Sequence, residues 1–122
     1  MSDQKDPIIR FTALLDQARA LDPKVLPEPT AFALGTVDEK GMPAVRILLL
    51  KGVDERGFVF YTNHESRKGR ELLATKRAAL CFHWQPLEVQ VRIEGSAAPV
   101  ADDEADAYFA SRPRGSQIGA WA

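Results

Sequence analysis

Two arginines and two serines lie close together near the C-terminal end of the chain, in the segment SRPRGSQIGAW (residues 111–121). The guanidinium group of arginine is a planar set of donors that matches phosphate or carboxylate, so this segment is a candidate anion-binding site. Pro113 and Gly115 predict that a helix ends here and that the chain turns. Such a turn would let Ser116 point back toward the arginines.

The segment before it, residues 101–112, predicts a short helix with acidic residues in its first turn, where they complement the helix dipole. A spacing of four residues would place Tyr108 and Arg112 on one face, where they could hold a phosphorylated aromatic compound. The alternative is an ordinary amphipathic helix, with Ala105, Tyr108 and Phe109 facing the core and Arg112 as a C-terminal charge. Taken alone, these residues favour the alternative.

Ser66, Arg67 and Lys68 form a second candidate anion site at the start of a predicted helix over residues 66–76. Ser66 can cap this helix, whose free amides and positive dipole end would face the same point as the two cations. Phosphate is the ligand that such an arrangement fits. A solvated basic turn of a surface helix explains the same residues equally well.

Arg46 and Lys51 flank a run of four apolar residues, 47–50, and form a third candidate site. Strict alternation along a strand would place the two cations on opposite faces. Either a bulge intervenes, or the charges serve different parts of a ligand, or one of them faces a second subunit. Two cations that simply reach water at the strand ends are the more frequent outcome for such a run.

Glu88, Gln90 and Arg92 alternate with valines, so they line one face of a predicted strand. A glutamine amide in this position could read the polar edge of a heterocycle. No catalytic residue can be identified from the spacing of residues along the sequence, which indicates no nucleophile with its base, no carboxylate pair and no activated cysteine. Several anion sites without a protein nucleophile indicate that an organic cofactor performs the chemistry.

The elements that must position these residues are several short strands with short helices between them. The connections are hairpins, and there is no GxGxxG turn, so an antiparallel sheet curled into a barrel is favoured over a doubly wound fold. The continuous apolar run 47–50 further predicts that both faces of its strand are covered. Helices are predicted over residues 7–21 and 66–76, and strands over residues 31–37, 43–51, 58–62, 78–84 and 87–95. A turn is predicted at residues 38–41, with Gly41 where a positive φ would be needed.

Composition limits the class of protein. The chain has 122 residues, enough for one domain, with 45% hydrophobic and 27% charged residues and a net charge of −1. This charge gives no broad reason to expect nucleic-acid binding. We expect a cytoplasmic protein without a membrane segment, because the single cysteine, Cys81, cannot form an intrachain disulfide and no stretch resembles a signal or membrane helix. Cys81 is expected to be a buried hydrophobic residue, and no metal site is expected.

Together, the segments RILLLK (46–51), FYTN (60–63), SRK (66–68), EVQV (88–91) and SRPRGSQIGAW resemble the pyridoxine/pyridoxamine 5'-phosphate oxidase family. The resemblance covers residues 29–121, and the closing segment is its most specific part. It implies a mainly β protein with flanking helices, an antiparallel split β-barrel of the FMN-binding type, and a homodimer. Residues 1–28 would form an N-terminal helix and connector, and residues 29–122 the barrel.

The resemblance also implies an activity and its residues. The activity is FMN-dependent oxidation of pyridoxamine or pyridoxine 5'-phosphate to pyridoxal 5'-phosphate, with O2 as acceptor and H2O2 as product. The substrate phosphate would be bound by Lys51, Tyr108, Arg112 and Ser116. The cofactor would be bound by Arg46, Ile47, Leu48, Leu49, Leu50, Lys51, Tyr61, Thr62, Arg67, Lys68 and Gln90, of which Arg67 and Lys68 would hold the phosphate of FMN.

The family pattern continues beyond the last residue of this chain, through a Gln-Ser pair, a further tryptophan and an Arg-x-His motif. A basic N-terminal segment of the family is also not recognisable in residues 1–26. We therefore expect a barrel domain that is truncated at its C-terminal end relative to the family. Two alternative functions remain: a noncatalytic or impaired protein that binds FMN or pyridoxal phosphate, and a related flavoprotein with another substrate, against which the four substrate-binding residues argue.

Overall fold

Short strands and two helices make up the described part of the chain. The computed structural model describes residues 7–54, 57–61, 67–99 and 108–120. The helices are α2 (Pro7–Arg19) and α3 (Arg67–Thr75), and a short 3-10 helix, η1 (Gln85–Leu87), separates two of the strands. The strands are β1 (Ala31–Val37), β2 (Pro43–Asp54), β3 (Gly57–Tyr61), β4 (Arg77–Trp84), β5 (Val89–Pro99) and β6 (Tyr108–Ala120).

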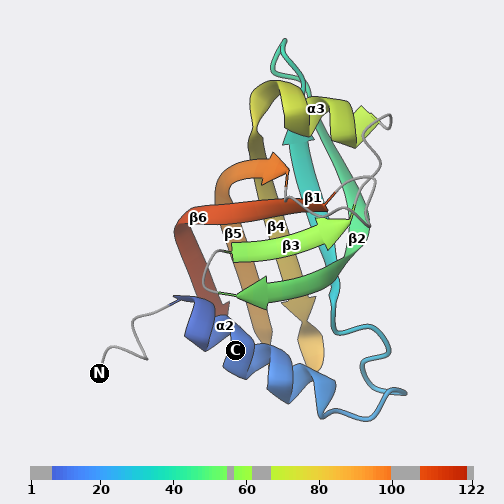
Figure 1. The fold of residues 1–122 in the computed structure, drawn as a ribbon. Helices are drawn as coiled ribbons and strands as arrows, with labels where there is room; N and C mark the ends of the chain where they lie inside the picture. Colours follow the sequence, from blue (N-terminus) through green and yellow to red (C-terminus); the bar gives the residue numbers. More distant parts are fainter. Residues whose placement is uncertain (1–6, 55–56, 62–66, 100–107, 121–122) are drawn as a thin grey trace.

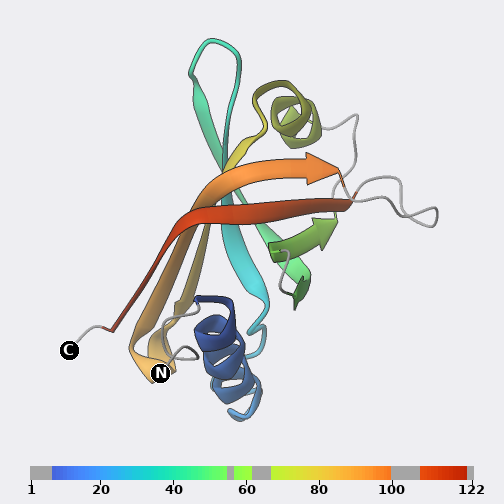
Figure 2. The same ribbon diagram turned by 60° about the vertical axis from the view of Figure 1, so that its left-hand side comes forward.

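The strands form a closed barrel in the order β1-β2-β3-β6-β5-β4. Every neighbouring pair is antiparallel, in agreement with the predicted antiparallel sheet. Figures 1 and 2 show α2 at one end of the barrel and α3 at the other. This arrangement confirms the predicted mainly β fold with flanking helices.

Aromatic side chains fill the barrel end that α2 covers. Phe11 of α2 is completely buried, and its ring centroid lies 4.8 Å from that of Phe58, 4.9 Å from Phe82 and 5.6 Å from Trp84. The Trp84 indole nitrogen donates a hydrogen bond of 2.8 Å to the carbonyl of Pro29, which ties the connector after α2 to β4. The N-terminal helix therefore belongs to the core of the barrel.

The turn between β1 and β2 follows the chemistry predicted for residues 38–41. Gly41 adopts a positive φ of 87°, which side chains rarely tolerate. One carboxylate oxygen of Asp38 accepts hydrogen bonds from the backbone N–H groups of Lys40 (2.9 Å) and Met42 (2.8 Å). The turn brings β2 back along β1 in register, from Thr36 opposite Ala44 to Ala31 opposite Leu49.

The helix predicted over residues 101–112 is wrong where the structure describes the chain, because residues 108–120 form the strand β6. This strand pairs with β3 on one side and with β5 on the other. Without it, the facing edges of both neighbours would leave backbone donors and acceptors unpaired, a cost that outweighs a local preference for helix. Residues 101–107 of the predicted helix lie outside the described residues.

Pro113 and Gly115 were expected to end a helix, and they instead flank an irregularity within β6. Gly115 pairs with Glu94 and Pro113 pairs with Gly95, so Arg114 is an extra residue in the strand. A bulge is one of the few places in a sheet where proline is accepted, because the ladder is interrupted there. The sequence signal for a break in regular structure was sound, but the broken element is a strand.

Candidate functional site

Arg46 lies on β2 opposite Leu34, a completely buried residue of β1. Its side chain is half-buried, and Nε is a buried nitrogen without a hydrogen-bond partner among the described residues. An unpaired buried donor of a charged group is costly and is rare in native proteins. Arg46 therefore requires an acceptor, which an anionic or carbonyl-bearing ligand would supply.

The run from Arg46 to Lys51 is divided between the two faces of β2. Leu48 and Leu50 share the covered face with Arg46, whereas Ile47 and Leu49 are 67% and 53% exposed on the other. A ligand on one face would thus meet only half of these side chains. The prediction that both faces are covered is wrong for the single chain, because the antiparallel barrel covers only its inner face.

A bulge lies at Lys51, but it does not bring Lys51 to the face of Arg46, because burial alternates without interruption from Arg46 to Lys51. Leu50 pairs with Phe60 and Gly52 pairs with Val59, so Lys51 is the extra residue on β2. Its side chain is exposed. Lys51 therefore lies where the regular hydrogen-bond ladder between β2 and β3 is interrupted.

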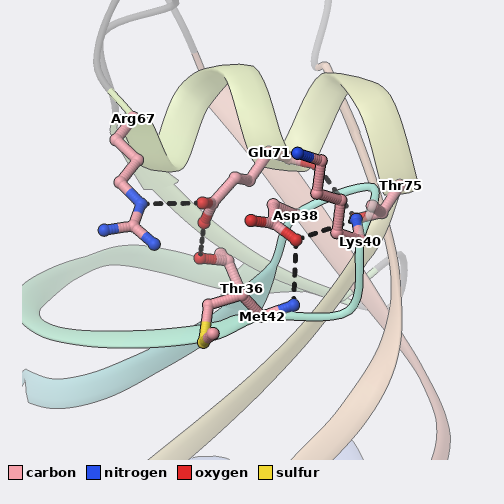
Figure 3. Close-up of polar contacts among 7 residues, drawn as sticks. All are labelled: Thr36, Asp38, Lys40, Met42, Arg67, Glu71 and Thr75. Carbon is pink, nitrogen blue, oxygen red and sulfur yellow. Dashed lines mark hydrogen bonds and ion pairs between the residues drawn. The ribbon is translucent and has the colours of Figure 1, made fainter.

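Arg67, the first residue of α3, belongs to a polar network that also includes Glu71 and Thr36 (Figure 3). Arg67 Nε donates to Glu71 Oε2 at 2.9 Å, and the Thr36 hydroxyl donates to Glu71 Oε1 at 2.5 Å. The hydrogen bond from Thr36, followed by that from Arg67, lowers the pKa of Glu71. The same bond and the charge of Glu71 raise the pKa of Arg67. Both shifts favour the charged forms of the pair.

Sequence reasoning did not identify Thr36 and Glu71 as members of this network. The spacing of four residues between Arg67 and Glu71 was an available signal, because such pairs meet on one helix face. No local signal connects Thr36 to Glu71, which lie on different elements. Ser66, the predicted helix cap, and the side chain of Lys68 lie outside the described residues.

The other predicted residues lie on neighbouring strands. Tyr61, 48% exposed at the end of β3, is in register with Tyr108 of β6. The backbone of Arg112 pairs with Ser96, and that of Ser116 with Ile93, both on β5. Gln90 is half-buried on the same strand. Thr62 and the side chains of Tyr108, Arg112 and Ser116 lie outside the described residues, so the structure relates these substrate candidates to the barrel only by backbone register.

Cys81 is half-buried on β4. Burial raises the pKa of its thiol, although the nearby charge of Arg92 opposes this shift. The thiol is therefore protonated near neutral pH and is a poor nucleophile. Among the described residues there is no cluster of three or more metal-ligating side chains, and no helix is long and apolar enough to cross a membrane.

A groove of about 930 Å³ crosses one end of the sheet. Gly35 of β1 and Ala79 of β4 form part of its wall, and Arg77, Arg92 and Glu94 add charges. None of the residues predicted to bind cofactor or substrate is among those that line it. The groove is consequently not the site that the sequence predicted.

The fold is a split β-barrel, the fold of a class of flavin-binding proteins. It is similar to PhzG from Burkholderia lata 383, solved in complex with tetrahydrophenazine-1-carboxylic acid, with a TM-score of 0.75 and 22% identity over 98% of this chain and 84% of that chain. A pyridoxamine 5'-phosphate oxidase-related, FMN-binding protein from Nostoc punctiforme PCC 73102 gives a TM-score of 0.61 and 23% identity over 78% of this chain and 49% of that chain.

The chain belongs to the pyridoxamine 5'-phosphate oxidase family, whose sequence profile matches residues 21–122. It is 56% identical to the pyridoxine/pyridoxamine 5'-phosphate oxidase of Agrobacterium fabrum over 99% of its own length and 57% of that protein. It is 60% identical to the oxidase of the same name from Bordetella petrii over 95% of its length and 54% of that protein. The chain thus spans little more than half of these relatives.

Proposed function

We propose that this chain binds FMN and takes part in the oxidation of pyridoxamine or pyridoxine 5'-phosphate to pyridoxal 5'-phosphate, with O2 as acceptor and H2O2 as product. Sequence identities of 56% and 60% to two oxidases of this name support the substrate class. The structural observation that carries the proposal is the buried Nε of Arg46, which has no acceptor among the described residues.

The residues present fit FMN. Its phosphate and ring carbonyls are acceptors of the kind that Arg46 Nε lacks, and its phosphate suits the guanidinium of Arg67. Arg46 and Arg67, with Lys68, Tyr61, Thr62 and Gln90, would hold the cofactor. When bound, FMN supplies an acceptor for the two electrons that leave the substrate.

The chain's own contribution is binding and orientation. Arg67 is held through its Nε by Glu71, so its terminal nitrogens can face a phosphate. Lys51, displayed at the β2 bulge, would bind the substrate phosphate together with Tyr108, Arg112 and Ser116. No protein group is assigned to move a proton or to attack the substrate, so rate enhancement rests on bringing the two reacting molecules together.

We also propose a homodimer whose interface includes the outer face of β2. Val45, Ile47 and Leu49 are 69%, 67% and 53% exposed there. Their partners on β1 are Gly35, Ala33 and Ala31, so a ridge of large apolar side chains borders a row of small residues. A contiguous apolar surface of this shape is typical of a protein interface.

A cytoplasmic location stays a prediction.

Oxygen uptake tests the activity. The purified chain is loaded with FMN, and pyridoxamine 5'-phosphate is added in an oxygen electrode. Steady uptake with formation of H2O2 is the expected result. Bound FMN without uptake would support the noncatalytic alternative. Failure to bind FMN would reject both functions.

Two arginine substitutions should separate the cofactor site from the substrate site. Arg112→Ala is expected to weaken binding of the substrate phosphate by about 1.5–3 kcal/mol, because a charge-assisted hydrogen bond is lost. Arg67→Ala should chiefly weaken the binding of FMN. Titration of each variant with FMN and with pyridoxal 5'-phosphate measures both affinities, and Arg10→Ala on the exposed surface of α2 is the matched control. Equal losses of FMN affinity in the two variants would contradict this division.

A further inference from the structure

We infer that Glu71, anchored by Thr36, is a positioning residue that fixes the guanidinium of Arg67 for the phosphate of the flavin. The inference rests on the proposed FMN function and assigns a role to two residues outside the predicted site. Glu71 would touch neither cofactor nor substrate. Its effect would pass entirely through the orientation of Arg67.

The carboxylate of Glu71 is held at both oxygens. Glu71 is only 6% exposed and Thr36 only 2%. Oε1 accepts the hydrogen bond from the Thr36 hydroxyl, and Oε2 accepts that from Arg67 Nε. A buried carboxylate with two such partners has little freedom to rotate, because turning it would leave a buried charge unsatisfied. The hydrogen bond from Thr36 connects Arg67 and Glu71, both on α3, to strand β1 of the barrel.

Arg67 is suited to bind an anion while it is held. A guanidinium carries five N–H donors, and the hydrogen bond to Glu71 Oε2 uses only the one on Nε. The Arg67 side chain is 54% exposed, and Figure 3 marks its contact with Glu71 at Nε. An ordinary surface pair of this spacing is mobile and contributes little. Here the partner is immobile, so the guanidinium is pre-organised.

The charge of Glu71 acts in the opposite direction, because it would repel the flavin phosphate. The charge of Asp38 also acts on Arg67 and Glu71, and Asp38 is unchanged in the variants below. A test must therefore remove the charge equally in both variants and change only the hydrogen bonds. Glu71→Gln and Glu71→Met do this with side chains of similar length. Glutamine can still accept from Arg67 Nε and donate to the Thr36 hydroxyl, whereas methionine does neither well.

The experiment titrates the full chain and each variant with FMN and with riboflavin, which lacks the phosphate, and follows flavin fluorescence. We expect Glu71→Met to bind FMN about tenfold more weakly than Glu71→Gln, the effect of immobilising one long side chain. Riboflavin should bind the two variants equally. In an Arg67→Ala background, the difference in FMN affinity should disappear. Thr36→Val should also weaken FMN relative to riboflavin, and it tests the inference should Glu71→Met fail to fold.

Several outcomes would overturn the inference while leaving the proposed function intact. Equal FMN binding by the two Glu71 variants would show that the orientation of Arg67 does not matter. A parallel loss of riboflavin would indicate a general structural role. A difference that persists without Arg67 would show that Glu71 acts through another group. Failure of the unsubstituted chain to bind FMN would instead reject the proposed function, and the inference with it.

Discussion

Replacement of Phe11 by alanine is expected to lower the free energy of unfolding by about 3–5 kcal/mol, the range for loss of a buried phenylalanine. Phe11 is the residue of α2 that enters the aromatic cluster with Phe58, Phe82 and Trp84. Removing the ring would leave a cavity among side chains that belong to two strands, β3 and β4, so the surroundings can collapse only partly. Denaturant unfolding followed by circular dichroism measures the change.

Ile9→Ala is the matched control for this prediction. Ile9 lies on the same helix but is 47% exposed, so its truncation removes little buried area and should change stability by about 0.5 kcal/mol or less. A small effect of Phe11→Ala, similar to that of the control, would mean that α2 is not part of the cooperative core. The prediction is therefore also a test of whether the N-terminal helix and the barrel form one folding unit.

Ile47→Asp is expected to convert the proposed homodimer into a monomer at micromolar concentration. Ile47 lies at the centre of the outer apolar face of β2, between Val45 and Leu49. In a symmetric dimer each copy would bury one new carboxylate without a partner, and desolvation costs several kcal/mol for each charge. Sedimentation velocity measures the mass of both forms.

Val25→Asp provides the control, because Val25 is a comparably exposed apolar residue (54%) outside this face. It should leave the oligomeric state unchanged. A wild-type chain that sediments as a monomer, or an Ile47→Asp variant that remains dimeric, would show that the outer face of β2 is not the interface. Unchanged circular dichroism of Ile47→Asp would establish that the barrel itself remains folded, as expected for a substitution on an exposed face.

The sequence predicted most elements of the barrel because their signals are local. Residues 31–37 alternate between the two faces of a sheet and form β1 with the predicted bounds. Phe11, Leu15 and Ala18 recur at helical spacing and share the buried face of α2. Gly41 indicated the position in the first hairpin where a positive φ is needed. Each of these features depends on residues only a few positions apart, so neighbours in sequence are sufficient to specify it.

The site depended more strongly on contacts between distant segments. Arg46 and Arg67 were identified by their charge, but the missing acceptor at Arg46 Nε became visible only when the barrel buried it. The bond between Thr36 and Glu71 joins residues 35 positions apart, and no local pattern predicts such a pair. The bulge at Lys51 likewise became visible only in the register of β2 against β3.

By itself, the amino-acid sequence determined the strand and helix periods, the turn chemistry, the family resemblance and the identities of the cations that could bind phosphate. The tertiary structure decided which of these cations are buried, anchored or displayed, and it placed a strand at Tyr108–Ala120 where a helix was expected. The physical reason is that closing a barrel imposes hydrogen-bond pairing and burial between segments far apart in the chain, and these demands outweigh local preference.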